Sequence, residues 1–314
     1  MTQTKQDDSR VIKNKVKELL KDDQNEKYVG WHEIAFLDLL GQQSKLRELN
    51  TLPTAENQKE IEDFKHKIGE IYKPIYALHT FFKVAIEASI DLGIDYPNLT
   101  TQDQEFRKQF RSTPIYRRHF SDSLILDVPL SNDIGKFPCR AIYIVLVSTA
   151  LSFLSCMAFG WVIRGGIEVG LAMDIDKDEV YGPALAWAYS LESRVANYPR
   201  IVIGQTLTRY LQDMASLPKP TKEGIINRKS AVRSLNILKV DDDGNTILDY
   251  LGEDVRNVML LPEQQVVQKA YNLVIEQSNK HKAEKNTKLG FRYSLLRNYF
   301  ESRLPSWGIS IQSE

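Results

Sequence analysis

The chain has 314 residues, enough for one large domain or two modest ones, and its 41 basic residues balance its 41 acidic residues. Balanced charge provides no global field that would attract nucleic acid or an anionic membrane, so an anionic ligand must be held by a local arrangement. The two cysteines, Cys139 and Cys156, lack CxxC spacing and the five histidines are scattered, which argues against a zinc site or a disulfide framework.

The N-terminal region, residues 1–30, is expected to form a charged helix and a linker. It begins MTQTKQDDSRVIKNKVKELLKDD and contains no apolar signal core, and this pattern predicts a cytoplasmic protein. The next segment, WHEIAFLDLL at 31–40, is an apolar run of strand length that ends at Gly41. We expect it to be the first strand.

A helical insert is predicted between residues 42 and 112, where apolar residues recur at helical spacing among many charged ones. One side of this insert is expected to face solvent. The following segment, IYRRHFSDSLILDVP at 115–129, has two extended runs on either side of Ser121 and Asp122. This arrangement predicts a β-hairpin.

The segment between Arg140 and Arg164 contains no charged residue and is long enough to cross a bilayer. It also contains polar residues such as Ser148 and Ser152, and it runs directly into GWVIRGGIEVGLAM, which has the pattern of a strand. A buried helix followed by a strand fits this composition better, and we expect no membrane contact. A membrane span remains the alternative.

Turn and helix signals follow this strand. The acidic segment DIDKDE at 174–179 predicts a turn, and Gly182 and Pro183 fit the start of a helix whose apolar residues keep helical spacing. The apolar segment YPRIVIG at 198–204 predicts a further strand.

The composition changes after residue 217. KPTKEGIINRK is expected to be a polar connection, DDDGNTILDYLG a turn and a short strand, and residues 262–300 two charged helices. We therefore interpret residues 218–314 as an α-rich C-terminal accessory region.

Residues 31–217 thus contain strand, helices, hairpin, helix, strand, turn, helix and strand, the order of the split βαβ pattern of ferredoxin-like and palm folds. We predict an α+β protein with a βαββαβ core, the helical insert at 42–112 and the C-terminal extension. Such a core occurs in proteins of many functions, so the function must be inferred from the site residues.

Two carboxylates occupy informative positions in this order. Asp38 lies on the first strand just before Gly41, and Asp122 lies at the bend of the hairpin. Carboxylates on adjacent strands can bring oxygen ligands to a shared Mg²⁺ or Mn²⁺. An Asp at a strand end or hairpin bend is also commonly a turn residue that bonds its own backbone, and this structural alternative remains open.

The short sequence motifs around both carboxylates resemble those of class III nucleotidyl cyclases. FLDLLG resembles the family's F-x-D-hydrophobic-x-G signature, FSDSLIL its hairpin, usually written with Gly-Asp, and RGGIEVG its R-x-G-I-x-x-G strand. YGPALAWAYSLES resembles the helix that follows, so four landmarks occur in order within residues 31–204. The chain resembles most the divergent bacterial pyrimidine cyclases of antiphage defence.

The resemblance implies a two-metal site. Asp38, Asp122 and the carbonyl of Leu39 would be the ligands of two Mg²⁺ or Mn²⁺ ions. The backbone from Leu39 through Leu40 to Gly41 would face the triphosphate, and Phe36 would also contact the nucleotide.

The resemblance places the base-selecting pair at Arg118, four residues before Asp122, and at Glu179, just before the final helix. Pairing between Arg118 and Glu179 would set which base is accepted. The structural alternatives are a solvated strand face for Arg118 and an acidic turn for Glu179.

The sequence departs from the family where it usually has the transition-state Asn and Arg, because Ala186 and Ser190 occupy these positions. Losing both donors removes stabilisation of developing charge. Arg194, one helical turn after Ser190, is the expected replacement. Arg164 and Arg200 are weaker candidates, more in keeping with structural roles.

Three functions are compatible with these residues. The first is a nucleotidyl cyclase that converts a nucleoside triphosphate, with UTP and CTP as candidates, into a 3′,5′-cyclic nucleotide and pyrophosphate, in a homodimer with shared sites. The second is a catalytically silent nucleotide-binding or regulatory module, which Ala186 and Ser190 favour. The third is another palm-type nucleotidyl transferase, against which the lack of a basic stripe argues.

Overall fold

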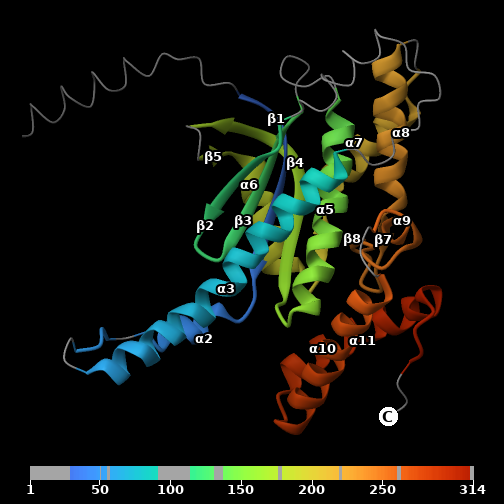
Figure 1. Cartoon of the computed structure of the whole chain (residues 1–314). Helices are drawn as coiled ribbons and strands as arrows, with labels where there is room; N and C mark the ends of the chain where they lie inside the picture. Colours follow the sequence, from blue (N-terminus) through green and yellow to red (C-terminus); the bar gives the residue numbers. More distant parts are fainter. Residues whose placement is uncertain are drawn as a thin grey trace, which may run out of the picture.

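The computed structural model describes residues 29–49, 51–54, 57–90, 114–130, 137–175, 179–218, 221–259 and 263–311. The predicted N-terminal helix, up to residue 28, and the last part of the predicted insert, 91–112, lie outside these residues. The protein is α+β, as predicted, with one mixed sheet of eight strands and helices packed against both faces in the part of the chain that is described (Figure 1).

The centre of the sheet is β1 (Val29–Leu39), which forms antiparallel pairs with β3 (Ser123–Pro129) and with β4 (Ile163–Asp174). The remaining hairpin strand, β2 (Tyr116–Phe120), pairs antiparallel with β3, so these four strands have the order β2-β3-β1-β4. The predicted first strand, the hairpin and the strand predicted within GWVIRGGIEVGLAM are therefore confirmed. Asp38 on β1 and Asp122 after β2 come to the same end of the sheet.

The sheet continues beyond β4 into the region expected to be accessory. The short strand β6 (Ile201–Ile203) lies parallel to β4, and β8 (Thr246–Leu248) and β7 (Leu238–Val240) follow as antiparallel neighbours. A two-residue strand, β5 (Val180–Tyr181), pairs with the end of β4. Because β8 bonds directly to β6, residues after 217 complete the sheet as well as packing on it.

One face of the sheet is covered by α5 (Pro138–Ala158) and by the second half of α3 (Gln58–Ser89). Within the described residues, α5 is the one helix long and apolar enough to cross a bilayer, yet 83% of its most apolar stretch is buried inside the protein. This helix packs against α3, α8 (Lys222–Asn236) and α10 (Glu263–Ala283). Its burial matches the expectation of a core helix.

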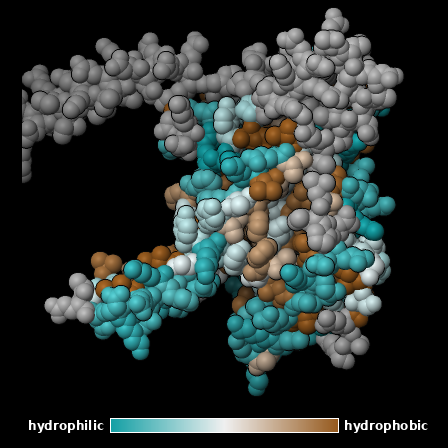
Figure 2. All heavy atoms as spheres, in the orientation of Figure 1, coloured by the Kyte–Doolittle hydropathy of each residue, from teal (hydrophilic) through white to brown (hydrophobic). Residues whose placement is uncertain are grey.

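The first half of α3, together with α2 (Gln42–Arg47), projects away from the body of the protein (Figure 1). The buried residues of α3 begin only at Ile71, and the projecting part is mainly hydrophilic with a few hydrophobic side chains at its edge (Figure 2). Asn57 caps the start of α3 by accepting a hydrogen bond from the backbone N–H of Glu60. The prediction of a helical insert with a solvent-facing side is confirmed for its described part.

The opposite face of the sheet carries α6 (Pro183–Ser190), which continues into one π-helical turn, η1 (Leu191–Val195). A smaller apolar cluster, including Ile34 and Phe36 of β1, lies beneath α6. A Cβ on Gly166 of β4 would lie only 2.3 Å from the Ala188 carbonyl oxygen. Glycine therefore lets the helix backbone approach the strand closely.

The segment KPTKEGIINRK is largely helical, so the prediction of a polar connection is wrong. Thr221 caps α8 by accepting from the N–H of Gly224, and Ile226 and Ala231 are buried on its inner face. The helix packs against α5 and against α7 (Gln205–Ser216). Two buried apolar positions among many charges are too weak a periodic signal to find from sequence.

The two predicted charged helices at the C-terminus are α10 and α11 (Thr287–Arg303), which pack side by side. They are preceded by the short α9 (Glu253–Arg256) and followed by a 3₁₀ turn, η2 (Leu304–Trp307), whose Trp307 is buried. The C-terminal helix pair, α10 and α11, lies at the end of the sheet where β1 leads into α2 (Figure 1).

Candidate active site

Asp38 and Asp122 meet at one corner of the sheet, which we call the carboxylate corner. Asp38 is the penultimate residue of β1, and Asp122 lies in the tight turn between β2 and β3, where Ser121 adopts a left-handed φ of 56°. The N–H of Leu39 donates to the carbonyl oxygen of Asp122 at 3.3 Å. This bond ties the hairpin turn to the end of β1 and keeps the two carboxylates close.

The immediate environment of Asp38 disfavours its charge. Its Oδ1 accepts a hydrogen bond of 2.9 Å from the Ser123 hydroxyl, its neighbour across the β1–β3 pair. Burial raises the pKa of Asp38 to about 6, the Ser123 hydrogen bond opposes this rise, and the charges of Glu192 and Asp122 add to it. Burial therefore makes the charged form of Asp38 costly, and the two acidic neighbours add to this cost.

Glu192 is a third acidic residue beside this corner, and it was not predicted from the sequence. It lies in the π-helical turn η1, is 2% exposed, and binds the Arg164 guanidinium with a distance of 2.7 Å from Nε to Oε1. Arg164 in turn stands opposite Asp38 in the β1–β4 pair. Arg164 therefore links Glu192 to the carboxylate corner and lowers the pKa of Asp38.

The composition of the carboxylate corner fits Mg²⁺ or Mn²⁺ bound together with phosphates. Such ions are commonly held by one or two carboxylates, water and substrate phosphate oxygens rather than by an all-protein cage. Among the described side chains, no group of three or more His, Cys, Asp and Glu residues is arranged to hold a metal. Asp38 and Asp122 would thus be the side-chain ligands, with the Leu39 carbonyl as the expected main-chain ligand.

A cavity of about 510 Å³ brings together three residues predicted to contact the nucleotide: Phe36, Arg118 and Glu179. The Phe36 ring meets that of Tyr189 from α6 edge to face, with centroids 5.3 Å apart. Flat apolar walls and a few polar groups are the usual features of a pocket for a planar ring. Tyr189 was not predicted, because an aromatic residue on a helix also fits a packing role.

The predicted pairing of Arg118 with Glu179 does not form. The Arg118 guanidinium instead pairs with Asp127 and Asp174, and Asp127 also contacts Nδ1 of His32 at 2.7 Å. Arg118 is buried, whereas Glu179 is exposed at the mouth of the cavity. The solvated position proposed as the alternative for Arg118 is also wrong, because two carboxylates offset the cost of burying its charge.

Two backbone N–H groups at the end of β1, which were expected to face a triphosphate, already have hydrogen-bond acceptors within the protein. The N–H of Leu39 donates to Asp122, and the N–H of Leu40 donates to the Val162 carbonyl oxygen at 2.8 Å. These two amides therefore do not face a triphosphate in this structure. Gly41 follows with a left-handed φ of 86°, which suits glycine and turns the chain into α2.

The helix α6 offers no amide or charged donor at the positions expected to stabilise the transition state. Ala186 lines the cavity of Phe36 and Tyr189, and Ser190 ends α6. Arg194, the predicted replacement, is exposed in the same π-helical turn as buried Glu192. No contact joins Arg194 to the carboxylate corner among the described residues.

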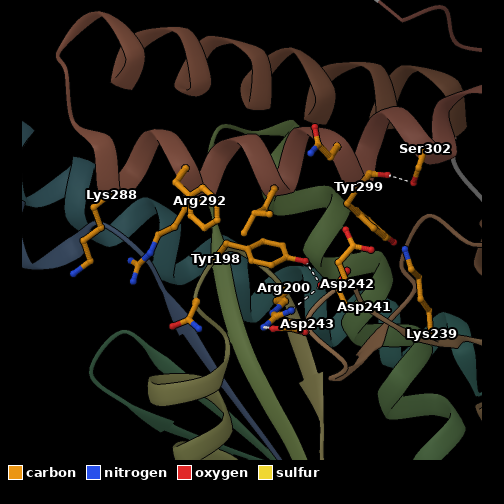
Figure 3. Close-up of a pocket in the computed structure, with 14 residues that line it drawn as sticks. Tyr198, Arg200, Lys239, Asp241, Asp242, Asp243, Lys288, Arg292, Tyr299 and Ser302 are labelled. Carbon is orange, nitrogen blue, oxygen red and sulfur yellow. Dashed lines mark hydrogen bonds and ion pairs between the residues drawn. The ribbon is translucent and has the colours of Figure 1, made fainter.

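Arg200, a weaker candidate, has a structural environment. It is buried, donates to Asp241 at 2.7 Å and pairs with Asp243, while Tyr198 also bonds to Asp241. These side chains line a separate hollow between the β7–β8 turn and α11 (Figure 3). The guanidinium of Arg200 is thus engaged in ion pairs with the β7–β8 turn.

Comparison of the sequence with protein-family models and with curated proteins finds no match.

Proposed function

We propose that the protein is a nucleotidyl cyclase with a palm-type core of the class III kind. The observation that carries the proposal is the carboxylate corner, where Asp38 and Asp122 come from a central strand and an adjacent hairpin turn. The strand order β2-β3-β1-β4 with helical connections supports the same class. The substrate is a nucleoside triphosphate, with UTP or CTP as the leading candidates.

In the proposed reaction the ribose 3′-oxygen bonds to the α-phosphorus and its proton passes to water. The bond from the α-phosphorus to the β-phosphate oxygen breaks, and pyrophosphate leaves with the electron pair. Two Mg²⁺ or Mn²⁺ ions at Asp38, Asp122 and the Leu39 carbonyl would supply activation of the hydroxyl and neutralisation of phosphate charge. The cavity of Phe36, Tyr189 and Glu179 would receive the base.

The metal-ligand assignment is tested by Asp38→Asn and Asp122→Asn, which should each abolish formation of cyclic nucleotide while the protein stays folded. Both changes keep the side-chain volume and remove the anionic ligand. Glu70→Gln is a suitable control, because Glu70 lies in the first half of α3, before the first buried residue of this helix, and is exposed. Full turnover in both Asn variants would sink the mechanism.

The protein is further proposed to act in the cytoplasm as a homodimer with shared sites, with its cyclic product as a signal in antiviral defence. Mixing Asp38→Asn protein with Glu179→Ala protein should then restore part of the activity. Equal activity of the mixture and of its separate components, under conditions where subunits exchange, would contradict shared sites.

A catalytically silent nucleotide-binding module is the second candidate. It is favoured by Ala186 and Ser190, which provide no charged donor, and by the backbone bonds that occupy the amides of Leu39 and Leu40. Such a module would bind a nucleoside triphosphate in the cavity of Phe36 without releasing pyrophosphate.

A further inference from the structure

A cavity of about 580 Å³ lies between the end of the sheet and the C-terminal helix pair. Its wall on the sheet side includes Leu40, Gly41 and Arg164, and its wall on the helix side includes Lys280 of α10 and Arg292 of α11. Leu40 and Gly41 follow Asp38 and Leu39 along the chain, and Arg164 stands opposite Asp38 in the register of the β1–β4 ladder. The cavity is therefore the immediate extension of the candidate active site.

The lining of this cationic cavity has four basic side chains, Lys45, Arg164, Lys280 and Arg292, and no Asp or Glu among the described residues. Arg164 is neutralised by Glu192. Lys280 and Arg292 form no side-chain hydrogen bond or ion pair with any residue that the structure describes. Two basic side chains therefore face a shared hollow without local neutralisation, in a protein whose total charge is balanced.

A buried histidine adds to the same wall. His281 is 9% exposed and lines the cavity beside Lys280. Its Nδ1 lies 3.3 Å from Glu284 but makes no hydrogen bond there, and its ring lies 5.4 Å from that of Tyr293. Buried polar atoms usually form a hydrogen bond, so this ring nitrogen is available to a ligand or to water.

Arg292 is directed into the space between α11 and the sheet. Figure 3 shows Arg292 and Lys288 extending from α11 on the side of Tyr198. Arg292 lines both the cationic cavity and the hollow of Arg200, whereas Lys288 lines only the latter. The two side chains thus provide a natural comparison, because they share a helix and a charge sign but not a cavity.

We propose that Lys280 and Arg292 bind the β- and γ-phosphates of the nucleoside triphosphate within the same chain. This inference rests on the cyclase function proposed above. Cations beside the β-phosphate oxygen stabilise the charge that develops as pyrophosphate leaves, and guanidinium and ammonium groups form charge-assisted hydrogen bonds with phosphate. The C-terminal helix pair thereby supplies the positive charge that Ser190 and the occupied amides of Leu39 and Leu40 do not.

The direct test uses inorganic tripolyphosphate as the probe, with binding measured by calorimetry in the absence of a nucleoside. The double variant Lys280→Gln/Arg292→Gln should bind at least about tenfold more weakly, because it loses two charge-assisted contacts. Lys288→Gln is the matched control and should bind like the wild type. Lys280→Gln/Arg292→Lys, which keeps the charge at position 292, should bind more tightly than the double Gln variant. This comparison shows whether the loss of affinity is electrostatic.

A parallel assay of cyclic nucleotide formation separates the inference from the proposed function. If the double variant loses tripolyphosphate binding but the wild type forms no cyclic product from any triphosphate, the phosphate site stands and the cyclase proposal falls. If the wild type is active and the double variant keeps both its turnover and its affinity, the inference is overturned while the cyclase proposal stands. Failure of the wild type to bind tripolyphosphate would likewise overturn the inference.

Discussion

Asp38 and Ser123 face each other across the β1–β3 pair, and the Ser123 hydroxyl donates to Oδ1 of Asp38 at 2.9 Å. This hydrogen bond fixes the orientation of a carboxylate whose pKa is raised to about 6, chiefly by burial. A partly buried carboxylate with a raised pKa weakens folding when it is ionised, and this fits a binding role better than a structural one.

Replacement of Asp38 by Asn should therefore separate stability from function. In metal-free buffer at pH 7.5 the wild-type carboxylate is largely ionised, and the raised pKa means that this ionisation disfavours folding. Allowing for its partial exposure, we expect Asp38→Asn to raise the free energy of unfolding by about 1 kcal/mol or to leave it unchanged. Urea unfolding monitored by circular dichroism measures this, and a loss of more than about 2 kcal/mol would indicate a structural carboxylate.

The buried network of Arg118 should matter more for stability than its exposed neighbour. Arg118→Ala leaves Asp127 buried without its guanidinium partner, which costs about 3–5 kcal/mol when a buried ion pair is broken. Arg117→Ala, one residue earlier on the same strand and exposed, should change the free energy of unfolding by less than about 0.5 kcal/mol. Equal effects of the two changes in urea unfolding would contradict the network.

Replacing Gly204 or Gly290 by alanine should change the free energy of unfolding in opposite directions. A Cβ on Gly204 would lie 1.9 Å from the Glu168 carboxylate, which accepts from the N–H of Leu207 at 2.8 Å and so caps α7. Gly204→Ala should lower the free energy of unfolding by about 1–2 kcal/mol, as loss of a cap does. Gly290 in α11 has open space around its Cβ position, so Gly290→Ala should raise it by about 0.5–1 kcal/mol.

The ion pair between Arg200 and Asp243 should contribute to stability only above strongly acidic pH. The hydrogen bond from Arg200 holds the pKa of Asp243 at about 2, below its ordinary value near 3.8. A lowered carboxyl pKa stabilises the folded state above the unfolded pKa, and the stabilisation is lost as the pH falls toward 2. Asp243→Asn should thus lower the melting temperature at pH 6 and bring it closer to the wild-type value at pH 2.5.

The sequence allowed prediction of the elements with long apolar runs. Long apolar runs, which are typical of buried segments, occur in β1, in the hairpin around Asp122, in α5 and in β4. The order of these elements along the chain defines the main part of the sheet. The helix α8 was missed, because its few buried positions lie among charged residues. The pairing of β8 with β6 was missed because three-residue strands carry no periodic signal.

The candidate site was only partly predictable for a related reason. The sequence places Asp38 and Asp122 at the ends of adjacent strands, and the structure brings them together. The partners of Arg118 could not be deduced, because Asp174 lies 56 residues further along the chain. Glu192 was missed because an acid on a short helix usually faces solvent, whereas here a π-helical turn directs it toward Arg164.

Cyclase activity is measured directly by incubating the purified protein with ATP, GTP, CTP and UTP in separate reactions containing Mn²⁺, followed by mass spectrometry. At least one triphosphate, with UTP and CTP the leading candidates, should yield a 3′,5′-cyclic nucleotide and an equal amount of pyrophosphate. Binding of a triphosphate without any cyclic product would contradict the enzyme and support a silent nucleotide-binding module.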